Sequence, residues 1–192
     1  ESGNIASHVA KLKGIGLAVV LTEARRIEDV PADLERLGAL TGAGEARAVA
    51  ARFRERLAAL RARHAGRPKV QVFYQVWNQP LMTVGGGQII SDAIRLCGGE
   101  NVFGALKQMA APVTVESVLA ANPEAIVASG MGEERPEWLD EWRRWPALTA
   151  VARNNLFFVP PDHLQRHTPR ILDGIERLCQ HLETARARRP VK

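Results

Sequence analysis

The sequence is poor in cysteine and has no long apolar run. Cys97 and Cys179 are its only cysteines, and no Cys-x-x-Cys pair is present. This arrangement excludes zinc-ribbon and dithiol redox motifs, and it leaves two buried thiols or one disulfide as open alternatives. No apolar run reaches the roughly 18 residues that a membrane-spanning helix needs, so we expect no direct membrane insertion.

The motifs of common enzyme classes are also missing. The chain has no Gly-x-Ser-x-Gly nucleophile elbow and no His-Glu-x-x-His zinc motif. Gly85-Gly86-Gly87 precedes a predicted helix and could place an anion at its N-terminus, but the lysine of a P-loop is absent. We therefore expect no enzyme and no catalytic cofactor. The alternative is a flavodoxin-like enzyme that uses the Gly85–Gly87 turn for a phosphate.

Positive charge is in moderate excess, with 26 Lys and Arg against 21 Asp and Glu. A nucleic-acid interface needs a basic face interleaved with aromatic residues or a known motif. The arginines between positions 47 and 63 alternate with alanine and glutamate, and most aromatic residues lie elsewhere. We therefore expect no nucleic-acid partner. Part of the remaining excess forms a basic C-terminal tail.

The segment 45–64 has the strongest helical pattern of the chain. One stripe of the predicted helix carries its large apolar residues, which are Val49, Phe53, Leu57 and Leu60. Glycines precede the segment, and Gly66 and Pro68 end it. We interpret 45–66 as a rigid helix that bridges two α/β lobes. An ordinary amphipathic helix within a single domain is the alternative.

The first 44 residues read as helix, strand and helix, over 1–13, 17–21 and 27–40. The run Leu-Ala-Val-Val-Leu at 17–21 is typical of a strand buried on both faces of a parallel sheet. A single strand cannot form a sheet or a core. We therefore expect residues 1–44 to be part of an N-terminal lobe in an N-terminally truncated chain.

Strands and helices alternate after the long helix, which predicts a parallel α/β lobe over 67–192. The expected strands are 69–76, 125–128 and 156–159. The expected helices are 88–96, 115–121, 136–145 and one that begins at 168.

Ligands of open parallel sheets bind beyond the carboxyl ends of the strands. Three loops, 76–87, 129–135 and 160–167, are predicted to meet there. Large apolar residues in and beside the first loop suggest a platform for a ligand, and His163 offers a single polar contact. His163 and His167 lie four apart, but no third metal ligand is evident. The candidate ligand-binding residues are Tyr74, Trp77, Met82, Gly85, His163 and Arg166.

Three stretches of this chain resemble a known family. They are VFYQVWNQPLMTVGGGQIISDAIRLCGGENVF from Val72, VTVESVLAANPEAIVAS from Val113 and TPRILDGIERLC from Thr168. They are similar to the C-terminal lobe of periplasmic vitamin B12-binding proteins. Those proteins belong to the helical-backbone (class III) substrate-binding proteins of ABC importers, and the resemblance covers essentially the whole chain.

The resemblance implies an α/β fold of two Rossmann-like lobes bridged by one long helix, with the N-terminal lobe incomplete here. It implies a periplasmic monomer that holds cobalamin or a related corrinoid in a cleft and delivers it to a membrane permease with its ATPase. Cys97 and Cys179 match the positions of a disulfide in the family, which suits an oxidising compartment. A haem- or ferric-siderophore-binding protein of the same family is the alternative.

The chain departs from the family pattern at three positions. Family members dock on their permease through one surface glutamate per lobe, and those positions carry Ala6 and Gln165 here. Docking through these two charges is therefore not expected. His163 stands where the family has an aromatic residue that covers the corrin, and its imidazole could stack on the ligand or hydrogen-bond to it.

Overall fold

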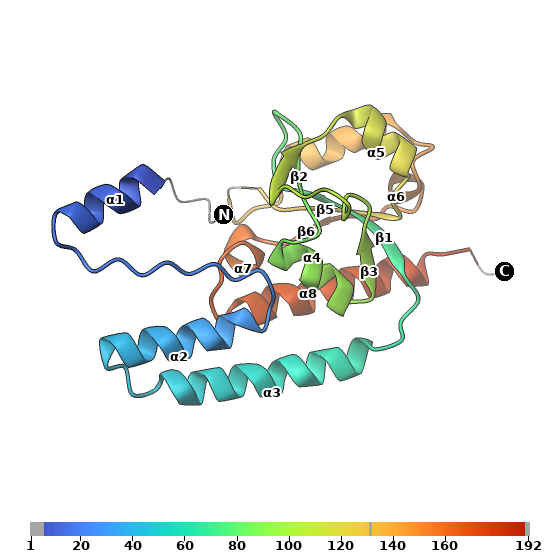
Figure 1. Ribbon diagram of the computed structural model, residues 1–192. Helices are drawn as coiled ribbons and strands as arrows, with labels where there is room; N and C mark the ends of the chain where they lie inside the picture. The colour runs from blue at the N-terminus through green and yellow to red at the C-terminus, as the bar shows by residue number, and fades with distance from the viewer. Residues whose placement is uncertain (1–5, 131, 191–192) are drawn as a thin grey trace.

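The computed structural model describes residues 6–130 and 132–190 and shows a layered α/β lobe with an N-terminal arm (Figure 1). A four-stranded sheet in the order β3-β1-β5-β6 forms the middle layer, and every neighbouring pair is parallel. Its strands are β1 Val70–Gln75, β3 Gly99–Asn101, β5 Ala125–Ala128 and β6 Leu156–Phe158.

Three strands of this sheet confirm the strands expected at 69–76, 125–128 and 156–159. β1 is buried on both faces because Tyr74 points to one core and Phe73 to the other. The structure adds β3 and an antiparallel pair formed by β2 Met82–Val84 and β4 Ala110–Pro112. These strands have three residues each, too few for a periodic pattern to be visible in the sequence.

Helices cover both faces of the sheet. One core lies between the sheet and α2 Asp29–Thr41, α3 Ala46–His64, α4 Ile89–Leu96 and α8 Ile171–Ala187. The other lies beneath α5 Val115–Ala121, the 3₁₀ helix η1 Glu137–Arg144 and α6 Thr149–Ala152. The helix expected at 136–145 is thus a 3₁₀ helix, bounded by prolines at both ends that limit it to a short segment.

The long helix expected at 45–64 is confirmed as α3, which is continuous over 19 residues. It runs beside α2 and α8 (Figure 1), and Phe53, Leu57 and Leu60 pack into the core. Several of its arginines are paired with carboxylates of the neighbouring helices and of the segment before α2: Arg54 with Glu35, Arg56 with Asp173 and Glu176, and Arg61 with Glu28. A bridge between two lobes, and the boundaries 1–44, 45–66 and 67–192, stay predictions.

The strand expected at 17–21 is wrong. Residues 17–25 belong to no helix or strand, and they follow α1 Ala6–Gly14, which has no buried residue. Leu17, Val20 and Leu21 are 53%, 45% and 46% exposed. A strand needs a hydrogen-bonded neighbour, and the described residues place no strand beside this segment. α1 therefore stands apart from the lobe, and the segment after it reaches the core at Ala24 (Figure 1).

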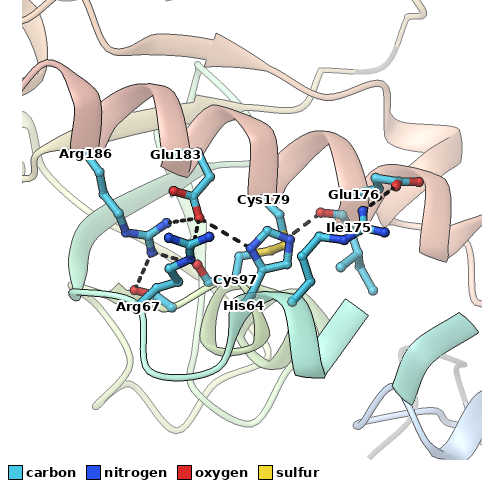
Figure 2. The surroundings of a disulfide bond; sticks show 10 residues. His64, Arg67, Cys97, Ile175, Glu176, Cys179, Glu183 and Arg186 are labelled. Atoms are coloured by element: carbon cyan, nitrogen blue, oxygen red, sulfur yellow. Dashed lines mark hydrogen bonds and ion pairs between the residues drawn. A yellow bond between two sulfur atoms is a disulfide. The ribbon is translucent and has the colours of Figure 1, made fainter. Parts of the chain in front are cut away.

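Cys97 and Cys179 form a disulfide, which settles the alternative that the sequence left open. It joins the C-terminal end of α4 to α8 (Figure 2). Beside it, Glu183 accepts a 3.0 Å contact from Arg186, and His64 Nδ1 lies 3.4 Å from the same carboxylate oxygen. Both cysteines are fully buried in the apolar core, and this polar cluster lies beside them.

Two arginines near the C-terminus, Arg186 and Arg189, bind along the amino ends of the strands. Arg186 donates 2.7 Å and 2.8 Å hydrogen bonds to the carbonyls of Cys97 and Pro68. Arg189 donates to both carboxylate oxygens of Glu124, the residue just before β5. These arginines tie α8 to the sheet. In the part of the chain that the structure describes, no helix is long and apolar enough to cross a membrane.

Candidate functional site at the carboxyl ends of the strands

The three predicted loops meet at one edge of the sheet. β1, β5 and β6 are parallel neighbours, so the loops that follow them leave from the same side. Ser129 N donates a 3.0 Å bond to Gln75 O, and Val159 N donates a 3.1 Å bond to Ala128 O. The ladder thus continues for one residue past each strand, and it holds the loop bases together.

Trp77 and Met82 form the base of a tight reverse loop after β1. Val76 N donates to Met82 O at 2.9 Å, and Met82 N donates to Trp77 O at 3.1 Å. The Trp77 indole N–H donates to Gln79 O at 3.0 Å, which fixes the ring. Trp77 is 37% exposed and Met82 is half-buried, so the loop offers an oriented apolar surface to solvent.

Tyr74 lies beneath that surface, and a ligand contact by its side chain stays a prediction. Side chains of β1 point alternately to the two faces of the sheet. That of Tyr74 points into the core that α4 and α8 cover, and it has no exposed area. Burial raises the pKa of Tyr74 to about 12, and the neighbouring Ser129 and Gln165 side chains oppose that shift. In this structure the buried ring therefore supports the loops from below.

Gly85 lies in a turn that packs against the segment before β4. Its N–H donates to Met109 O at 3.2 Å, and the N–H of Gly86 donates to Leu106 O at 3.3 Å. A Cβ at Gly85 would overlap the carbonyls of Leu106 and Gln108. The turn therefore needs glycine for close backbone approach, and two of its N–H groups are not available to a phosphate. A ligand contact by Gly85 stays a prediction.

The loop after β6 contains α7 Pro161–Leu164, which carries His163. Leu164 is fully buried in the core, and His163 and Gln165 on either side are half-buried. Gln165 Nε2 donates to Ser129 Oγ at 3.1 Å, so this loop is tied to the loop after β5. Arg166 is 68% exposed at its side chain and forms a 2.6 Å ion pair with Asp162.

The sequence did not predict the layer of polar side chains beneath this edge, which we call the polar floor and which consists of Gln75, Ser129 and Gln165. Gln75 and Ser129 are fully buried, and Trp142 Nε1 donates to Gln75 Oε1 at 2.7 Å. The available signal was Gln75 after the apolar run Val72–Tyr74 of a buried strand, since buried amides require partners. Gln165, expected only as a departure from a docking position, belongs to this floor as well.

The chain also has hollows in its surface away from this edge. Hollows of about 520 Å³ beside β3 and about 590 Å³ beside the α2–α3 turn contain none of the predicted site residues. Over residues 6–130 and 132–190, no group of three His, Cys, Asp or Glu side chains could hold a metal ion.

Comparison with known proteins relates the chain to solute-binding proteins. The family described as "Periplasmic binding protein" matches residues 13–163. A vitamin B12-binding protein of Vibrio parahaemolyticus is 32% identical over 192 residues, a match that covers 98% of this chain and 68% of that relative. The vitamin B12-binding protein of Salmonella typhimurium is 32% identical over 183 residues.

Solved structures show the same relationship. The periplasmic vitamin B12-binding protein of Vibrio cholerae superposes with a TM-score of 0.85 at 30% identity, over 96% of this chain and 72% of that one. A periplasmic heme-binding protein from Roseiflexus reaches a TM-score of 0.81 at 17% identity, which shows a shared fold alone.

Proposed function

This chain belongs to the periplasmic binding protein family, and we propose that it captures cobalamin or a related corrinoid in the periplasm. The observation that carries the proposal is the 32% identity to a vitamin B12-binding protein across nearly the whole chain. The TM-score of 0.85 with a second such protein supports it. Haem-binding relatives share the fold at much lower identity, so a corrinoid is favoured over haem.

The ligand surface of this proposal is the edge formed by the loops after β1, β5 and β6. Trp77 and Met82 would contact the large planar macrocycle, because burial of apolar area stabilises a complex by about 25 cal/mol per Å². His163 would contact it from the loop after β6, and Arg166 could reach a polar substituent of the ring. The hydrogen bonds among Gln75, Ser129 and Gln165 support a surface that is largely formed before the ligand arrives.

Delivery to the membrane permease and ATPase of an ABC importer completes the proposed role. The contacts of residue 165 argue against docking through that side chain, because its amide already donates to Ser129. Ala6 is exposed on α1 but carries no charge. We expect a monomer that docks through other surface groups.

Calorimetry on the 192-residue chain tests the ligand. Cyanocobalamin and cobinamide should each bind with one-to-one stoichiometry, and haemin and nucleotides should not. Binding of haemin without corrinoids would favour the haem alternative. Binding of a nucleotide alone would support the enzyme alternative.

A further inference from the structure

The backbones of α7 and α8 come very close to each other at Gly174. Gly174 is buried in the first turn of α8, and a Cβ built there would overlap the His163 carbonyl oxygen and lie 2.6 Å from its carbonyl carbon. Ordinary contacts between carbon atoms are 3.5–4.0 Å. The glycine is therefore required by the position of the His163 backbone and not by an unusual backbone conformation of α8.

Two further contacts hold α7 in the same place. Leu164 is fully buried in the core beneath the helix. Gln165 joins the end of α7 to Ser129 in the next loop. Gln165 N donates to Pro161 O at 2.7 Å, and this hydrogen bond closes the single turn of α7 into one unit. The unit has three supports, and only the contact at Gly174 depends on the absence of a side chain.

We propose that Gly174 is a positioning residue for ligand binding, because the space at its Cα sets where α7 presents His163. This inference rests on the proposed function, in which His163 contacts a corrinoid. A methyl group at position 174 would overlap the His163 carbonyl, and about 1 Å of separation between the two backbones would restore ordinary contact distances. Displacements of this size weaken sites whose supporting residues are fixed by packing.

A matched control exists elsewhere in the chain. Gly38 lies within α2, and a Cβ there would overlap the Ala46 side chain of α3. Gly174→Ala and Gly38→Ala therefore introduce the same methyl group into equally tight helix contacts. Gly38 belongs to the α2–α3 pair and contributes nothing to the three loops. The pair of variants separates general destabilisation from displacement of α7.

The experiment measures the Kd for cyanocobalamin and the hydrogen exchange of residues 160–168 in the full chain and in both variants. Gly174→Ala should weaken binding tenfold or more and accelerate exchange in 160–168. Gly38→Ala should lower the melting temperature with Kd and local exchange unchanged. If Gly174→Ala fails to fold, Leu164→Ala removes another support of α7 and should give the same two results.

Equal Kd values for Gly174→Ala and the unmodified chain would overturn the inference, as would equal weakening by Gly38→Ala. If the unmodified chain binds no corrinoid, the proposed function fails, and a ligand-binding role of Gly174 fails with it. The exchange measurement is independent of ligand. Faster exchange of 160–168 in Gly174→Ala alone would still support the placement of α7, and unchanged exchange would overturn it.

Discussion

Cys179 of α8 is bonded to Cys97 at the end of α4, across 82 residues of sequence (Figure 2). The closed loop contains β3, β5, β6 and the loops after β5 and β6. A cross-link of this span lowers the entropy of the unfolded chain much more than that of the folded one. The disulfide is therefore a stabilising tie for most of the lobe.

Removal of this tie should cost stability. The double variant Cys97→Ser/Cys179→Ser should lose about 4–5 kcal/mol of unfolding free energy, the value that chain entropy gives for a loop of this length. Urea unfolding with and without dithiothreitol measures the effect. The reductant should destabilise the unmodified chain and leave the double variant unchanged. Equal urea midpoints for the oxidised and reduced chain would contradict the prediction.

The pairing of Glu124 predicts acid sensitivity. Burial alone would raise the pKa of Glu124, but hydrogen bonds from Arg189 and the charges of Arg189 and Arg153 outweigh it and hold the pKa below its ordinary value of 4.5. The folded state thus favours the ionised carboxylate. Its contribution is present above the ordinary pKa and disappears as pH falls through the lower folded-state value.

Glu124→Gln should therefore destabilise the protein by about 1.5–3 kcal/mol at pH 7, the range for hydrogen bonds to charged groups. The difference from the unmodified chain should narrow as pH falls below 4.5. Urea unfolding at pH 7 and pH 3.5 measures both values. Glu133→Gln changes an exposed carboxylate in the loop after β5 and serves as the control. A difference that stays constant across this range would refute the assigned role of the ion pairs.

Trp77 is the exposed aromatic residue of the proposed ligand surface. Trp77→Ala should weaken cyanocobalamin binding at least tenfold, or about 1.4 kcal/mol, because an oriented apolar contact is lost. Its effect on stability should be small, since the ring is 37% exposed. Trp145→Ala is the matched control: that ring packs on Trp142, 5.4 Å between centroids, so stability should fall with affinity unchanged. If Trp145→Ala weakens cyanocobalamin binding and Trp77→Ala leaves the Kd unchanged, the ligand binds elsewhere.

The amide of Gln165 should matter for the loop that it anchors. Gln165→Glu replaces the donor that faces the Ser129 hydroxyl and carbonyl with a carboxylate. Loss of this contact should cost about 1–2 kcal/mol of unfolding free energy, as for other partly buried hydrogen bonds. Gln165→Leu, which also lacks the donor, should lose a similar amount. If both variants are as stable as the unmodified chain, Gln165 does not tie the two loops.

Much of the fold is predictable because its elements carry local signals. The stripe of α3 and the apolar strands β1, β5 and β6 need only spacing and residue type to be recognised. The segment 17–21 has an equally clear strand pattern, but no strand lies beside it among the described residues. The local pattern of residues indicates which secondary structure a segment prefers. A strand also needs a second strand to which it can hydrogen-bond.

The site is harder to predict than the fold, because burial depends on contacts between distant segments. Tyr74 and Trp77 are both aromatic and only three positions apart, yet one is fully buried and the other exposed. The difference arises because β1 ends at Gln75 and the chain then turns outward. Pairing of Gln165 with Ser129 likewise requires knowledge of how two loops meet.

The most direct test of the account is a calorimetric titration of this 192-residue chain with cyanocobalamin. The account predicts saturable one-to-one binding with a micromolar or tighter Kd, and clear weakening in Trp77→Ala. No heat of binding with cyanocobalamin or cobinamide, from protein that is folded by circular dichroism, would contradict it.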